Sequence, residues 1–243
     1  MELFNKENNS EEYQKEESVY SAIFDLLEKL QNKSNKACGE TWHALHYGYS
    51  EHKPVQPPLI AIQRFLQKVL KAEQRSPMEA EHICSDRLDP DTALVLNAAW
   101  KVMHEFDRLR GLLRFSPEPA PAKMPDSKPA AGGTGEWYIA RCTPDHFVLP
   151  LFSDHFLKRF GTISWAIIDE RRNYILYSEE GKKPVLQNMP VVEKKHHISD
   201  GWENLWKNYH SSINNESRFN PQLQKQFMPR RYWKYLPEAP SAE

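Results

Sequence analysis

The sequence predicts an α+β fold in which an N-terminal helical unit is followed by a small antiparallel sheet packed with helices. The apolar residues of the first half recur every three or four positions, as on one face of a helix, whereas segments after residue 135 alternate as strands do. Between the two patterns, residues 117–135 read "PEPAPAKMPDSKPAAGGTG", a composition typical of a linker or long loop. We therefore expect the main boundary of the chain at this segment.

The first half divides into an acidic tail at residues 1–17 and a helical unit at residues 18–116. Three apolar stripes predict helices, and the third has the clearest start, because Asp89 can cap it and Pro90 suits a first helical position. The stripes consist of Val19, Ile23, Leu26, Leu27 and Leu30, then Leu59, Ile62, Phe65, Leu66 and Val69, and finally Val95, Ala99, Val102, Phe106 and Leu109.

The second half, residues 136–243, is predicted as an α+β module. "EWYIARC" and "SWAIIDERRNYILYSEEG" indicate strands, the latter as two strands joined by a turn near residues 170–173. "SDHFLKRFG" predicts a short helix capped by Ser153 and closed by Gly161. A last long helix, "SDGWENLWKNYHSSI", carries an aromatic face that we expect to pack on the sheet. That face consists of Trp202, Leu205, Trp206, Tyr209 and Ile213.

Composition excludes several classes of protein. No apolar run approaches the ~18–20 residues of a membrane span, and the acidic start differs from a secretory signal, so we expect a soluble cytoplasmic protein without membrane contact. Cys38, Cys84 and Cys142 are odd in number and far apart, which predicts reduced thiols and no disulfide framework. The chain contains none of the sequences GxxxxGK[ST], GxSxG and HExxH, and no GxGxxG after a strand, and we predict no cofactor.

One cluster could hold a metal ion. The stretch "TPDHFVLPLFSDHF" contains two Asp-His pairs, Asp145 with His146 and Asp154 with His155, and both residue types bind divalent ions. A structural interpretation is favoured, because Asp145 follows a Pro as turn residues do and Asp154 suits the first turn of a helix. The metal site is the alternative.

The segment "NPQLQKQFMPRRYWKYLPE" interleaves rings with cations, and the formal charge of −1 for the whole chain means that any nucleic-acid surface must be local. Arg230, Arg231 and Lys234 could bind phosphates while the rings stack on unpaired bases. Residue chemistry alone favours core packing, with the cations reaching water, and we expect Trp233 to be buried while both arginines face a ligand. In "DERRN", Arg171 and Arg172 could also bind a phosphate, although an exposed turn is favoured.

The C-terminal segment also resembles the closing signature of a bacterial family of DNA repair or DNA metabolism proteins built on a domain of unknown function. Three further stretches are similar to that family and come in its order: "LRGLLRF" (Leu109–Phe115), "PDHFVLPLFSDHFLKRF" (Pro144–Phe160) and "WAIIDERRNYILYS" (Trp165–Ser178). The resemblance covers about Ser18 to Glu238. Family members usually open with a strand containing Tyr-Asp-Gly, which is not evident here, and their connection at residues 117–135 is shorter.

Members of that family are found beside a radical-SAM protein or fused to a uracil-DNA-glycosylase-like domain. The resemblance therefore implies an accessory protein of DNA repair or DNA metabolism, which binds DNA or one of these enzymes, and it carries over no catalytic residue. Two alternatives stay open. One is a metal-assisted nuclease or hydrolase that uses the two Asp-His pairs, and the other is an adaptor that binds a partner enzyme without touching DNA.

Overall fold

The computed structural model describes residues 18–47, 59–119, 136–189, 201–215, 217 and 220–237. The chain divides into two compact units, one made of Met1–His104 with Asp145–Phe147 (unit 1) and one made of Glu105–Pro144 with Val148–Glu243 (unit 2). Helix α5 (Pro90–Leu112) begins in unit 1 and ends in unit 2. The predicted acidic tail at residues 1–17 and residues 120–135 of the predicted linker lie outside the described residues.

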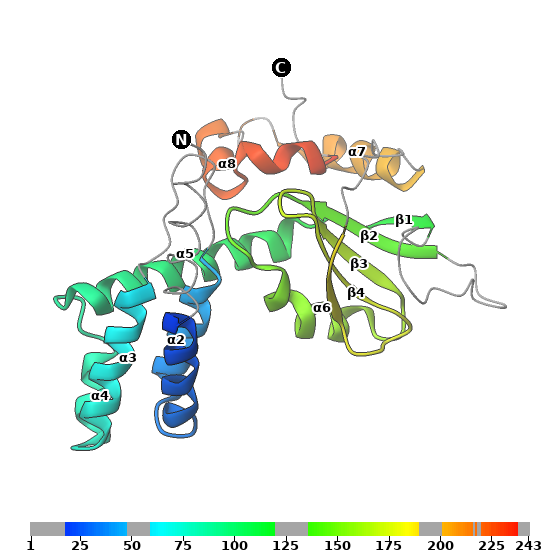
Figure 1. Ribbon diagram of the computed structural model, residues 1–243. Helices are drawn as coiled ribbons and strands as arrows, with labels where there is room; N and C mark the ends of the chain where they lie inside the picture. Colours follow the sequence, from blue (N-terminus) through cyan, green and yellow to red (C-terminus); the bar gives the residue numbers. More distant parts are fainter. Residues whose placement is uncertain are drawn as a thin grey trace, which may run out of the picture. The chain divides into compact units, whose positions relative to one another are not determined.

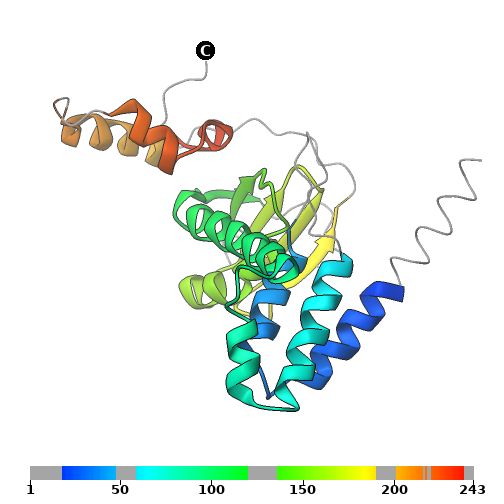
Figure 2. The same cartoon turned by 90° about the vertical axis from the view of Figure 1, so that its left-hand side faces the viewer.

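Unit 1 is helical where the structure describes it, as the sequence predicts. Residues 18–30 form a helix, followed by α2 (Asn35–Leu45), α3 (Leu59–Glu73), α4 (Pro77–Ile83) and the first part of α5. The helices that precede α5 run beside one another in Figures 1 and 2, and the first part of α5 runs across them. The Asp89 carboxylate accepts the Thr92 N–H at 2.9 Å, which confirms the predicted cap of α5. The predicted stripe of α3 is buried at Ile62, Phe65, Leu66 and Val69.

Unit 2 contains a five-stranded mixed sheet in the order β1-β2-β3-β4-β5. Its strands are β1 (Ser116–Pro119), β2 (Glu136–Cys142), β3 (Trp165–Asp169), β4 (Tyr174–Ser178) and β5 (Val185–Asn188). Strands β2 and β3 are parallel and every other pair is antiparallel. Parallel neighbours need a crossover, and the short helices η1 (Leu149–Phe152) and α6 (Ser153–Phe160) lie in the connection between β2 and β3 (Figure 1). The α+β class is thus confirmed, whereas the expected antiparallel sheet is in fact mixed, because β2 and β3 pair in parallel.

Two local expectations differ from the structure. The predicted linker starts with a strand, because residues 117–119 belong to β1, where Pro117 and Pro119 are tolerated at the edge of a sheet. Helix α6 ends at Gly161 as predicted, with a φ of 58° that suits glycine, but Ser153 is not its cap. The Ser153 hydroxyl instead donates to the Pro150 carbonyl at 2.9 Å.

The core of unit 2 is rich in aromatic side chains. Phe152, Phe156 and Trp165 are fully buried, and the ring of Phe156 lies 5.6 Å from that of Phe152 and 5.8 Å from that of Trp165. Cys142 is buried in this unit and Cys84 in unit 1, while Cys38 is half-buried, and all three thiols are free, as the sequence predicts. Among the described residues, no helix has the length and apolar character needed to cross a membrane.

Three helical segments complete unit 2. They are α7 (Gly201–Ile213), α8 (Pro221–Phe227) and the 3-10 helix η3 (Arg230–Tyr235). Pro221 stands at the start of α8, and the Asn220 side chain accepts the Leu223 N–H at 3.0 Å, so the start of this short helix is encoded locally.

Candidate nucleic-acid interface

The geometry of η3 places its two tyrosines on a face separate from its three cations. A 3-10 helix has three residues per turn, so residues three apart share a face. Tyr232 and Tyr235 lie on one face, Arg230 and Trp233 on the second, and Arg231 and Lys234 on the third. The Arg230 guanidinium lies 5.8 Å from the centre of the Trp233 ring, a cation–π contact that leaves the arginine exposed.

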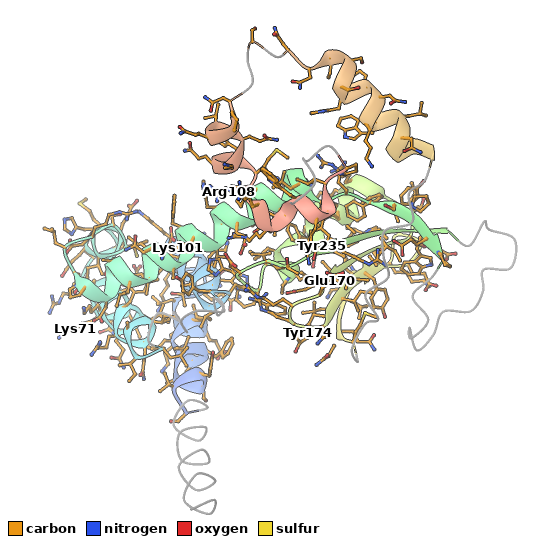
Figure 3. The ribbon with its side chains drawn as sticks, turned by 90° about the horizontal axis from the view of Figure 1, so that it is seen from above. Lys71, Lys101, Arg108, Glu170, Tyr174 and Tyr235 are labelled. Atoms are coloured by element: carbon orange, nitrogen blue, oxygen red, sulfur yellow. The ribbon has the colours of Figure 1, made fainter. Side chains whose placement is uncertain are left out.

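The tyrosine face anchors η3 to the rest of unit 2. Tyr232 is 1% exposed, and its hydroxyl donates to the carboxylate of Glu105, which comes from α5 and is 4% exposed. The Tyr235 hydroxyl donates to Glu170 at 2.6 Å, and both residues are marked in Figure 3. Burial raises the pKa of both hydroxyls, and the nearby carboxylates raise it further, so each tyrosine stays a hydrogen-bond donor.

The predicted phosphate-binding cations of η3 are exposed, but two of them also have protein partners. Arg231 Nη2 lies 3.1 Å from the buried Glu105 carboxylate, and Lys234 Nζ lies 3.4 Å from Glu170. Arg231 therefore contributes to the stability of the fold, which the sequence did not predict. The expectation that Trp233 is buried is wrong: Trp233 is half-buried, with its Nε1 donating to the Met228 carbonyl at 2.7 Å, and Tyr232 is the buried ring.

The arginines of the β3–β4 turn have structural contacts. The backbone N–H groups of Arg171 and Arg172 donate to the Asp169 carboxylate at 2.9 and 3.2 Å, and their Nη1 atoms donate to the Pro144 carbonyl at 3.1 and 3.0 Å. Arg172 Nη1 also lies 2.9 Å from Asp169, which is fully buried. Both guanidinium groups thus hold the turn, and a phosphate-binding role for them stays a prediction.

The two Asp-His pairs belong to different units. Asp145 and His146 are assigned to unit 1, where the His146 ring stacks on Tyr47 at 4.5 Å. Asp154 lies exposed in the first turn of α6 in unit 2, and the pKa of His155 is lowered by burial and then by the nearby Arg110 and Arg159. Within the described ranges, no group of three or more His, Cys, Asp or Glu side chains is placed to hold a metal ion.

The aromatic face of α7 is exposed rather than packed on the sheet, which corrects the expectation from the sequence. Trp206 is 41% exposed and Tyr209 is 54% exposed, and their ring centres lie 5.7 Å apart. Leu205 and Ile213 are also exposed, while the side chain of Trp202 lies outside the described residues. An amphipathic pattern identifies an apolar face but not what covers it.

An open cavity of about 310 Å³ lies between the end of α7 and α8. The lining includes His210 of α7 and Asn214, which follows α7, together with Gln224, Phe227 and Met228 from α8 and its ends. Phe227 is 62% exposed, so its ring is accessible from solvent as well as from the cavity. Helix α8 is held by α5, because Arg108 Nη2 donates to the Gln226 carbonyl at 3.3 Å (Figure 3).

Charge is distributed unevenly along the chain. Residues 204–237 contain six Lys or Arg residues and one carboxylate, Glu216, which gives this segment a net formal charge of +5. Because the whole chain has a formal charge of −1, the remaining residues sum to −6. Five of the six cations are exposed, namely Lys207, Lys225, Arg230, Arg231 and Lys234. We call residues 204–237 the cationic segment.

The comparison with known proteins identifies the family and gives no function. A family model described as a domain of unknown function, DUF4130, matches residues 61–238. No significant match is found among curated proteins or among solved structures. The match covers well over half of the chain and includes the sheet, η3 and the cationic segment. The chain therefore belongs to the family defined by the domain of unknown function DUF4130.

Proposed function

We propose that this protein is a cytoplasmic accessory protein of DNA repair or DNA metabolism that binds DNA through its cationic segment. The observation that carries the proposal is the net charge of +5 on residues 204–237 in a chain whose remaining residues sum to −6. A local concentration of exposed Lys and Arg is the electrostatic footprint of phosphate binding, and acidic surroundings direct the polyanion to that segment.

The anchoring of η3 supports the same proposal. Tyr232 and Tyr235 hold the helix through Glu105 and Glu170, so the fold fixes the direction in which Arg230 projects. Fixed cations on a rigid element lose less side-chain entropy on binding than cations on a free chain end. The resemblance to DNA metabolism proteins adds a radical-SAM protein or a uracil-DNA-glycosylase-like enzyme as the partner that would act on the bound DNA.

A protein–protein adaptor is the second candidate function. The exposed aliphatic side chains of Leu205, Ile213 and Leu223 favour it, because such groups gain by burial against another protein and offer nothing to a phosphate. The hydrolase alternative has no assembled ligand set within the described residues.

The test is the salt dependence of DNA binding by the full chain, measured by the anisotropy of fluorescently labelled DNA. We expect Lys225→Ala with Arg230→Ala to weaken binding and to reduce the slope of log K against log salt, by about 0.9 per lost contact on duplex DNA. Both side chains are exposed, so the variant should fold. Arg231 is left in place because it pairs with the buried Glu105.

A matched control removes two exposed lysines outside the cationic segment, Lys71 on α3 and Lys158 on α6. The control changes the net charge by the same amount. An equal loss of affinity in both double variants would show that total charge, and not this segment, governs binding. Absence of DNA binding by the unaltered protein at low salt would overturn the proposal. The protein–protein adaptor would then be the favoured function.

A further inference from the structure

The exposed rings of α7 and α8 lie within the cationic segment, and no described feature of the fold explains their exposure. Trp206, Tyr209 and Phe227 are 41%, 54% and 62% exposed. Folding alone favours burial of such rings, since each large aromatic side chain gains free energy when it leaves water. Their exposure beside Lys207 and Lys225 points to a ligand that is both flat and negatively charged.

We propose that α7 and α8 form a binding site for single-stranded DNA, in which the rings stack on unpaired bases and the cations contact the backbone. This inference rests on the proposed function and specifies the form of DNA that is bound. Duplex DNA keeps its base faces stacked inside the helix, so exposed rings add little to duplex binding. Single strands offer their base faces to aromatic side chains, and stacking tolerates every base.

The spacing of residues on α7 places Trp206 on the same face as a residue that lines the cavity. Trp206 and His210 are four positions apart and therefore share a face of α7, and His210 lines the cavity. On the other side of the cavity stand the Phe227 ring and the Met228 side chain. A base that stacks on Phe227 would therefore lie within reach of α7.

The polar groups of the cavity suit the edge of a base. Asn214 and Gln224 each carry an amide group with both donors and an acceptor, which can pair with the donors and acceptors of any base. The volume of about 310 Å³ lies at the lower end of the ~300–1,000 Å³ typical of small-molecule sites, which fits one base and not a folded partner. Residues 204–237 contain only one carboxylate, Glu216, beside six Lys or Arg residues. The segment therefore has a net positive charge, opposite to that of the backbone phosphates.

The experiment compares binding of the full chain to oligo-dT and to a duplex of the same length by fluorescence anisotropy. We expect tighter binding to oligo-dT, and we expect each of Trp206→Ala, Tyr209→Ala and Phe227→Ala to weaken it about 5- to 150-fold. Duplex binding should change less than twofold. All three side chains are exposed, and circular dichroism checks that the helices are retained.

The matched controls are Leu205→Ala and Ile213→Ala, because both residues lie on α7 and are 59% and 58% exposed. They remove similar apolar surface without removing a ring, and we expect them to keep affinity for oligo-dT. An equal loss of affinity for oligo-dT in the aromatic and the aliphatic variants would overturn the proposal that the rings stack on bases. Conversion of a dimer to a monomer by the aromatic variants, with unchanged DNA affinity, would assign the surface to a second copy of the chain and overturn the proposal.

The remaining outcomes separate this inference from the proposed function. If the Lys225→Ala, Arg230→Ala variant loses affinity for DNA while the aromatic variants do not, the DNA-binding function stands and the single-strand site is overturned. If the unaltered protein binds neither oligo-dT nor the duplex, both the DNA-binding function and the single-strand site are contradicted. Tighter binding to oligo-U RNA than to oligo-dT would also overturn the assignment to DNA.

Discussion

Removal of the Tyr232 hydroxyl tests whether the buried contact with Glu105 anchors the cationic segment. Tyr232→Phe keeps a ring that is 1% exposed and removes only the donor to a carboxylate that is 4% exposed. A hydrogen bond to a charged group contributes about 1.5–3 kcal/mol to stability, and the ion pair of Glu105 with Arg231 is retained in the variant. We therefore expect the free energy of unfolding to fall by about 1.5–3 kcal/mol.

The assay is urea denaturation followed by tryptophan fluorescence and circular dichroism, with the change read from the midpoint at constant slope. Tyr209→Phe is the control, because it makes the same chemical change on a side chain that is 54% exposed, and it should stay within about 0.5 kcal/mol of the unaltered protein. A double-mutant cycle with Glu105→Gln isolates the coupling. Equal midpoints for Tyr232→Phe and Tyr209→Phe would refute the anchoring role.

Two further predictions concern stability. Since the pKa values of Tyr232 and Tyr235 are raised in the fold, their hydroxyls ionise near pH 10 in the unfolded chain but not in the native state, and stability should fall as pH rises above about 10. Replacing both with Phe should flatten that decline in urea midpoints measured from about pH 8 to pH 11. Gly181→Ala should destabilise the protein by more than about 1 kcal/mol, because a Cβ at its φ of 76° would lie 2.9 Å from the Gly161 carbonyl oxygen. Gly161→Ala, with a φ of 58° and no atom within 4 Å of the added Cβ, is the milder control, and an equal cost for both would remove the steric argument.

The local pattern of the sequence was enough to predict the α+β class and several element boundaries. The apolar and aromatic residues of "WAIIDERRNYILYS" predicted both strands and the turn between them, and β3 is buried at every position while β4 is buried at three of its five positions. Asp89 and Pro90 marked the start of α5, because the cap by Asp89 and the preference of Pro for the first helical position depend only on residues of the first turn. Strand β1 was missed because its two prolines are atypical of a strand and are tolerated only at an edge.

The candidate site was predicted only in part. The interleaved rings and cations of the C-terminal segment were visible in the sequence, but the identity of the buried ring depends on the three-residue turn of η3, which places Tyr232 inward instead of Trp233. The pairing of Arg231 with Glu105 was not predictable, because 126 residues separate the two. The exposure of the aromatic face of α7 was missed, because the periodicity of apolar residues in a sequence does not show whether another part of the protein covers that face.

The contact between Glu105 and Tyr232 also governs how unit 2 is completed during synthesis. The two residues are 127 positions apart, so the Glu105 carboxylate of a growing chain lacks this hydrogen-bond donor until η3 has been translated. A chain interrupted between β5 and η3 would contain every strand of the sheet and still lack this closing contact. Since η3 lies within the cationic segment, the same stretch of sequence completes the core and supplies three of the segment's six cations. Cellular quality control that removes incompletely folded chains would therefore also remove chains that lack these three cations.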